Sequence, residues 1–332
     1  MITRRSVLKL FALGSAAVVV GDVPDSEFSQ ESLSHLDKFR RLPRERRLEV
    51  LSQLEQSLEL TETGKELKEI VASVKVPELE NKSVPSGMVI YNPIQNVVYL
   101  NSLGTLGQAQ LYLGGESILF ARAHERIHYL QHNLSKWRSL EDFIRDHSKQ
   151  QRNFETGASS ITLEAADISA LIRFIEQWNG KHQISEAEAV KSLKELVANF
   201  FNPQRNLIYE MQAYLSFNPI GPDQLYAGLS RNPVTSVWLS QIGREQFDQV
   251  YFKTSELLGM QKPKEAALLV ASHGTSVDDY FNAIERLKKD KGINNALVQG
   301  QERQKRLQVD TDLIKRKAQE VINNAYIKQY TR

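Results

Sequence analysis

From residue 116 to the C-terminus, the sequence is a succession of segments with helical apolar spacing, and this pattern favours a mainly α-helical fold. Asn-Gly, Asn-Pro and Lys-Pro pairs separate most of the segments, and such pairs are typical helix stops and starts. We predict helices over residues 116–133, 140–150, 160–177, 185–200, 206–217, 234–258, 264–272, 276–289 and 295–330.

The region before residue 116 combines helical and extended patterns. Leucines recur at helical spacing between residues 27 and 74, among many charged residues, which predicts a helical region. Residues 88–91 and 96–100 are rich in β-branched and aromatic residues and flank Asn92-Pro93, which predicts a β-hairpin. A further short strand is predicted at residues 109–113, before Gly114-Gly115. The expected fold class is therefore mainly α with a small β-hairpin or sheet (α+β).

Residues 1–21 have the pattern of an export signal, a basic start followed by an apolar run. The run from Thr3 to Lys9 contains Arg4-Arg5 and resembles the twin-arginine (Tat) signal, although Val7 stands where Phe is commonest. An ordinary Sec signal and a signal anchor are the alternatives. We expect an extracytoplasmic protein, periplasmic or secreted, whose partners include the export machinery.

The sequence pattern divides the rest of the chain into three predicted regions. We predict an N-terminal helical region at residues 22–80 (a possible pro-segment), a catalytic domain at 81–260 and a C-terminal helical region at 261–332. Lys and Arg total 42 against 40 Asp and Glu, a balance that excludes a strongly basic nucleic-acid binder, so no nucleic-acid partner is expected.

The absence of cysteine leaves only His, Asp and Glu as metal ligands. The chain has seven His, and three of them (His124, His128 and His132) lie within nine residues. His124-Glu125-Arg126-Ile127-His128 is an H-E-x-x-H sequence within a predicted helix. Residues four apart share a helix face, so both imidazoles can reach one Zn2+, and Glu125 is placed to take a proton from water activated by that ion. We therefore expect one Zn2+ per chain.

The third ligand is open between two carboxylates on later predicted helices. His132 lies about 12 Å along the helix axis from His124, too far to share the ion, and Gln131 stands where a metzincin motif has Gly. Glu210 lies among apolar residues, with Ala213 three positions later. Glu164 lies closer to His128 in the chain and is followed by Asp167.

A family resemblance favours Glu210. His128-Tyr129-Leu130-Gln131 and Glu210-Met-Gln-Ala213-Tyr214 resemble the two metal-binding helices of small zinc metallopeptidases of the gluzincin type. The resemblance covers about a quarter of the chain. It implies a zincin-like architecture, metal ligands His124, His128 and Glu210, and Glu125 as general base. It also implies His273 as a donor to the oxyanion, and residues 96–100 as a strand that pairs with an extended peptide or protein substrate.

The sequence therefore predicts an exported zinc metallopeptidase. The alternative is a non-enzymatic exported helical scaffold or inhibitor in which the H-E-x-x-H sequence is incidental. A zinc hydrolase acting on a non-protein amide is a third reading.

Overall fold

The computed structural model describes residues 30–80, 89–92, 97–100, 104–133, 203–231, 239 and 242–330. In these residues the protein is mostly helical, with one small sheet, which confirms the mainly α fold class. The helices predicted at residues 140–150, 160–177 and 185–200 lie outside the described residues, as does the signal at residues 1–21. Within the described part, no helix combines the length and the apolar character that crossing a membrane requires.

The N-terminal region is helical, as its leucine spacing predicts. It comprises α2 (Gln30–Arg41), α3 (Arg44–Ser57), a short 3-10 helix η2 (Leu58–Leu60) and α4 (Glu62–Ser73). Pro43 directly precedes α3, where its fixed φ suits a helix start. Thr61 caps α4 by accepting a hydrogen bond from the Gly64 N–H at 2.9 Å. Local signals thus divide this region into separate helices.

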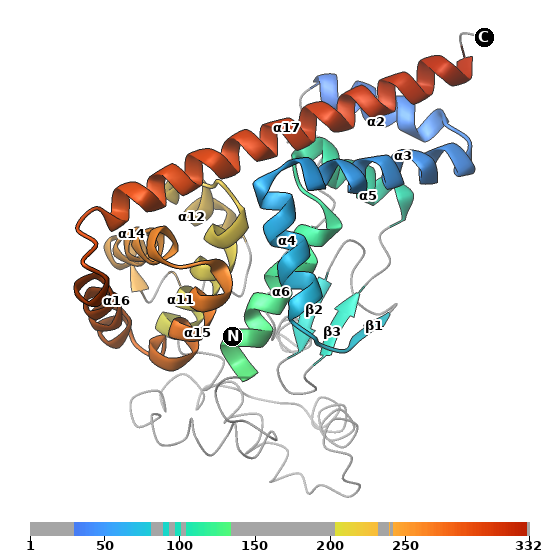
Figure 1. Cartoon of the computed structure of the whole chain (residues 1–332). Helices are drawn as coiled ribbons and strands as arrows, with labels where there is room; N and C mark the ends of the chain where they lie inside the picture. The colour runs from blue at the N-terminus through green and yellow to red at the C-terminus, as the bar shows by residue number, and fades with distance from the viewer. Residues whose placement is uncertain are drawn as a thin grey trace, which may run out of the picture.

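The predicted hairpin is present, within a three-stranded sheet. β2 (Val89–Asn92) pairs antiparallel with β3 (Val97–Leu100), and β1 (Glu78–Glu80) pairs parallel with β3, giving the order β1-β3-β2. The expectation that residues 96–100 form a strand open to substrate is wrong, because β3 is paired on both sides. The edge strand β2 instead packs against α6 (Ile118–Asn133) (Figure 1).

The strand predicted at residues 109–113 is also wrong, because this segment lies in α5 (Thr105–Gly114). Ala109, Tyr112 and Leu113 are buried at the i, i+3, i+4 spacing of a helix face, so the short apolar run was misread as extended. Gly115 ends the helix with φ +88°, and the Glu116 N–H donates to the Leu111 carbonyl oxygen at 2.8 Å.

The second half of the protein is a group of helices around α11 (Pro203–Phe217) (Figure 1). It includes α12 (Pro222–Arg231), α14 (Arg244–Met260), α15 (Pro263–His273) and α16 (Val277–Lys291). The helix predicted over residues 234–258 is not continuous, because Gly243 has φ +79° directly before α14. The other predicted helices in this half agree with the structure to within about three residues at their ends.

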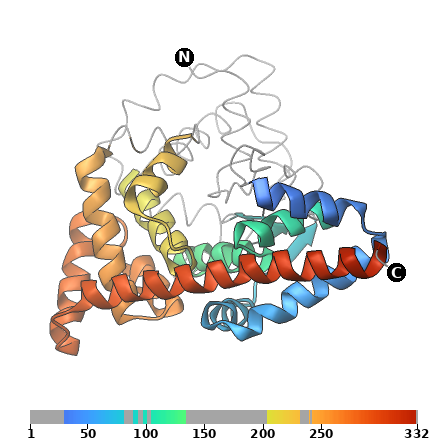
Figure 2. The same cartoon turned by 90° about the horizontal axis from the view of Figure 1, so that it is seen from above.

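The C-terminal helix α17 (Ala296–Tyr330) joins the two halves. Figures 1 and 2 show it running along the whole molecule, from α14 at one end to α2 and α3 at the other. Arg303 on α17 donates to the Glu66 carboxylate of α4 and to the Ser216 carbonyl of α11. One helix therefore ties together elements from both halves.

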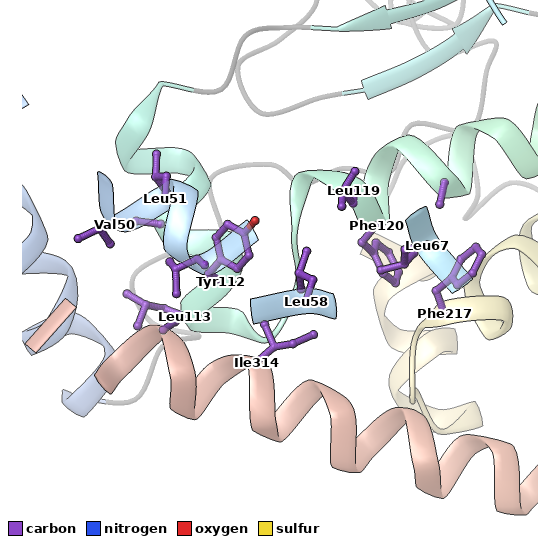
Figure 3. Close-up of a cluster of buried hydrophobic side chains, with 14 of the residues drawn as sticks. Val50, Leu51, Leu58, Leu67, Tyr112, Leu113, Leu119, Phe120, Phe217 and Ile314 are labelled. Carbon is purple, nitrogen blue, oxygen red and sulfur yellow. The ribbon is translucent and has the colours of Figure 1, made fainter. Parts of the chain in front are cut away.

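One hydrophobic core joins the N-terminal helices, α5 and α6 to residues of α11, α15 and α17. Figure 3 shows Leu67 of the N-terminal region beside Phe120 of α6 and Phe217 of α11, and Leu58 of the same region beside Ile314 of α17. Residues of the predicted pro-segment and of the C-terminal region thus belong to one core with the helix that carries the H-E-x-x-H sequence. This core fixes the position of that helix.

Candidate metal centre

Helix α6 carries His124, Glu125 and His128 in the middle of the protein. It packs between α4, α11, α15 and the edge strand β2. His124 and Glu125 are fully buried, and His128 is 3% exposed. A helix face exposed to solvent would not bury these three polar groups, so the motif does not lie on the surface of the protein.

The two imidazoles and the carboxylate of Glu210 converge on one point. The His124 and His128 Nε2 atoms lie 3.0 Å apart. Glu210 Oε2 lies 3.8 Å from His124 Nε2, and Glu210 Oε1 lies 3.6 Å from His128 Nε2. Tetrahedral zinc with bonds of 2.0–2.1 Å separates its ligand atoms by about 3.3 Å. With one ligand atom taken from each residue, the three atoms lie within 4.8 Å of one another, so the group could hold a metal ion.

Burial sets the protonation of these groups. It lowers the pKa of His128 to about 4 and that of His124 well below its usual value, with the neighbouring His128 adding to the effect at His124. It raises the pKa of Glu210 to about 8. The imidazoles are therefore neutral, which is the form that binds metals, and a cation in the site would take the place of the Glu210 proton.

Glu125 directly follows His124 on α6 but does not belong to the group of candidate ligands. Its Oε2 accepts a hydrogen bond from the Tyr91 backbone N–H of β2 at 2.7 Å. On α6, Glu125 follows His124 by about 100° of helix rotation, so its side chain leaves the helix toward the strand. A backbone N–H of the strand therefore holds the Glu125 carboxylate in place.

His128 has a hydrogen-bond partner on its other ring nitrogen. His128 Nδ1 lies 2.7 Å from Gln131 Oε1, and Gln131 Nε2 donates to Gln212 Oε1 of α11 at 2.6 Å. From the sequence, Gln131 served only for comparison with the metzincin and gluzincin motifs, and no role was predicted for Gln212. The sequence could have indicated the contact between His128 and Gln131, because Gln131 lies one turn after His128 on the same helix face.

Arg122 and Arg126 lie on the opposite face of α6 and bind Glu78 of β1. Arg126 also donates to the Val74 carbonyl at 3.2 Å and is only 4% exposed. Arg126 is about 200° around the helix from His124, so this charge within the motif points to the sheet and not to the metal group.

Two aromatic contacts border the group. The Tyr214 ring, one turn after Glu210, packs edge-on against the His124 ring at a centroid distance of 4.8 Å. His132 lies between the rings of Tyr91 and Tyr209, at 5.8 Å and 5.1 Å, and is not part of the metal group, as its helix position predicts. From the sequence, Tyr214 was only part of the second motif, and no role was predicted for it.

The remaining predicted residues are not brought into this group. His273 is the last residue of α15 and is partly exposed. The glycine after it lies against the Tyr209 ring, since a Cβ at Gly274 would be 3.2 Å from Tyr209 Cε1. Its role as an oxyanion donor stays a prediction. Glu164, the rival third ligand, lies outside the described residues.

Comparisons with known proteins did not identify a family for this chain. No protein-family model, no curated protein and no solved structure matches the chain. The functional argument therefore depends on the geometry of the site.

Proposed function

We propose that the protein is a zinc-dependent metallopeptidase exported from the cytoplasm. The observation that carries this proposal is the convergence of His124, His128 and Glu210 from two helices. Glu125 follows His124 in the chain, and the Tyr91 N–H holds its carboxylate. Two imidazoles and a carboxylate form a donor set that suits zinc, although other divalent transition ions accept the same ligands.

The arrangement supports catalysis better than a structural role for the ion. A structural zinc site usually has four protein ligands, whereas three are gathered here among the described residues. When bound, zinc supplies a Lewis acid that polarises a carbonyl and lowers the pKa of a coordinated water. Glu125 is the carboxylate placed to accept that water's proton and return it to the leaving amine.

The proposed substrate is a peptide or protein, by resemblance of the two motifs to zinc peptidases. Because β3 is internal and β2 packs against α6, the proposal no longer includes pairing of the substrate with residues 96–100. His273 is retained as the proposed oxyanion donor.

Metal analysis and hydrolysis together test the proposal. Elemental mass spectrometry of the purified protein should find one zinc per chain. A quenched-fluorescent peptide library should be cleaved, cleavage should stop with EDTA, and added zinc should restore it. Protein without stoichiometric metal and without cleavage would favour the non-enzymatic scaffold or inhibitor. Metal without peptide cleavage would point to a different amide substrate.

A further inference from the structure

Gln131 contacts both helices that carry the candidate ligands. Its Oε1 lies 2.7 Å from His128 Nδ1, on its own helix α6. Its Nε2 donates to the backbone carbonyl of Tyr209 at 3.0 Å, on α11 and directly before Glu210. The buried Gln131 amide therefore joins the His128 ring to the backbone directly before Glu210.

Two backbone carbonyls determine which way the amides point. Gln212 Nε2 lies 3.2 Å from the Pro263 carbonyl oxygen, and Gln131 Nε2 lies 3.0 Å from the Tyr209 carbonyl oxygen. A carbonyl oxygen only accepts hydrogen bonds, so each contact requires the NH2 side of the amide. The amide orientations therefore follow from the network itself.

Every amide hydrogen in this network has an acceptor. Gln131 donates to Tyr209 and to Gln212 Oε1, while Gln212 donates to Pro263 and to Ser216 Oγ at 2.9 Å. The Ser216 hydroxyl in turn donates to the Gln212 carbonyl at 2.7 Å. A fully satisfied buried network holds one arrangement, because any amide flip would place two donors or two acceptors against each other.

This arrangement fixes the tautomer of His128. Gln131 presents its oxygen to the ring, so His128 Nδ1 must carry the proton and donate it. His128 Nε2 is then left with its lone pair, directed at His124 Nε2 and Glu210. That is the form in which an imidazole binds a metal.

We propose that Gln131 is a positioning residue of the metal centre, which sets the His128 tautomer and the spacing between His128 and Glu210, with Gln212 holding Gln131 in place. This inference rests on the proposed zinc site. The partner of His128 is a neutral amide and not a carboxylate. It orients the ring without adding negative charge, so a bound divalent ion keeps more of its Lewis acidity.

The test compares two glutamine variants. Gln131→Met keeps the side-chain length and removes the three hydrogen bonds of the amide, to His128, Tyr209 and Gln212. Gln304→Met is the matched control, because Gln304 also donates from Nε2 to a carbonyl of α11, that of Leu215, at 3.0 Å, but touches no candidate ligand. Zinc affinity, measured by competition with a chromophoric chelator, should fall about ten- to hundredfold in Gln131→Met. In Gln304→Met it should stay within about twofold of the wild-type value, as expected for a residue without contact to the ligands.

A second measurement needs neither a variant nor metal. Nitrogen NMR of isotopically labelled histidine in the metal-free wild-type protein should show His128 protonated at Nδ1. A proton on Nε2 would overturn the inference even if the variant fails to fold.

The outcomes separate the two proposals. Wild-type protein that binds zinc, with equal affinity in Gln131→Met, would refute the role of Gln131 and leave the metallopeptidase proposal standing. Equal losses in both glutamine variants would show a general packing effect and would also refute it. Wild-type protein without zinc affinity would refute the proposed function, while the NMR result would still decide the tautomer.

Discussion

Glu125 Oε2 accepts a hydrogen bond from the backbone N–H of Tyr91, at 2.7 Å. This contact joins the helix of the metal group to the edge strand of the sheet. In an antiparallel pair, every second residue of an edge strand directs its N–H away from its neighbour. At Tyr91 that outward N–H donates to Glu125, which holds the carboxylate of the proposed general base in one position.

This contact predicts the effect of Glu125→Gln. A glutamine oxygen accepts the Tyr91 hydrogen bond equally well, so the fold and the zinc content should be unchanged. Because an amide does not accept the proton of water, kcat should fall by about 10²–10⁴. Steady-state cleavage of a library peptide, with zinc measured in the same samples, checks the prediction. Full activity of the variant would refute the proposed mechanism.

Glu210→Gln should abolish tight zinc binding. Burial raises the Glu210 pKa to about 8, so the metal-free wild type holds a neutral acid at pH 7, and a neutral amide of the same shape should fold equally well. Added zinc should raise the melting temperature of the wild type but not of the variant.

Two other carboxylates serve as controls for Glu210. Glu116→Gln changes another acid whose pKa burial raises, to about 7, and it should keep the zinc response. Glu164→Ala should keep it as well. Loss of zinc in Glu164→Ala together with retention in Glu210→Gln would transfer the ligand assignment to Glu164.

Glu78→Gln should destabilise the protein in a pH-dependent way. Burial raises the Glu78 pKa, but hydrogen bonds from Arg122 and Arg126 outweigh it, and the net pKa lies below the usual 4.5. A lowered folded-state pKa contributes stability above about pH 4.5, which is lost as the pH falls through the folded value. At pH 7 the variant should lose about 2 kcal/mol, because the buried Arg126 loses its charged partner.

Urea unfolding of wild type and Glu78→Gln at pH 7 and at pH 3.5 measures this effect. The difference in unfolding free energy should shrink at the lower pH. A difference of the same size at both values would contradict the electrostatic explanation. Arg40, whose pair with Asp37 is exposed on both sides, offers a control, since Arg40→Gln should change stability by less than about 0.5 kcal/mol.

Gly300→Ala should weaken the contact between α14 and α17. A Cβ at Gly300 would lie 2.0 Å from the Ser255 carbonyl oxygen, so the two helices would have to move apart, at a cost of about 2–3 kcal/mol. Gly228 of α12 has no atom within 4 Å of such a Cβ, and Gly228→Ala should be neutral or stabilising by up to about 1 kcal/mol. Thermal unfolding of both variants compares them. Similar melting temperatures would show that α14 and α17 tolerate a wider separation.

Replacement of Arg4 and Arg5 by Lys should retain the precursor in the cytoplasm, because the twin-arginine pathway recognises the paired arginines and not charge alone. Cell fractionation with an antibody against the protein measures this. Unchanged export of the double variant would leave the Sec pathway as the route.

The sequence by itself determined the features that depend on neighbours in the chain. Helical spacing with Pro and Asn-Gly breaks identifies most described helices, and β-branched residues around a turn identify the β2–β3 hairpin. The sharing of one helix face by His124 and His128 also follows from local geometry, since residues four apart lie within one turn. These features follow from the periodicity of the local backbone, and the packing of distant segments left them as the sequence predicts.

Only the tertiary structure decided features that depend on distant segments. The run at residues 109–113 is too short for its period to distinguish a strand from a helix, and burial against α2, α3 and α17 makes it helical. The central position of β3 requires β1, which pairs with it in parallel from an earlier part of the chain. Sequence spacing does not encode such pairing, because it depends on how the intervening chain folds.

The site shows the same division. The sequence placed two candidate ligands and Glu125 on one helix, but it left Glu210 and Glu164 as alternatives for the third. Packing of α11 against α6 brings Glu210 to the imidazoles, and the same packing creates the Gln131–Gln212 contact that orients His128. A hydrogen bond between two helices requires its donor and acceptor to lie about 3 Å apart. Only the close packing of the folded core positions atoms of distant segments with that accuracy.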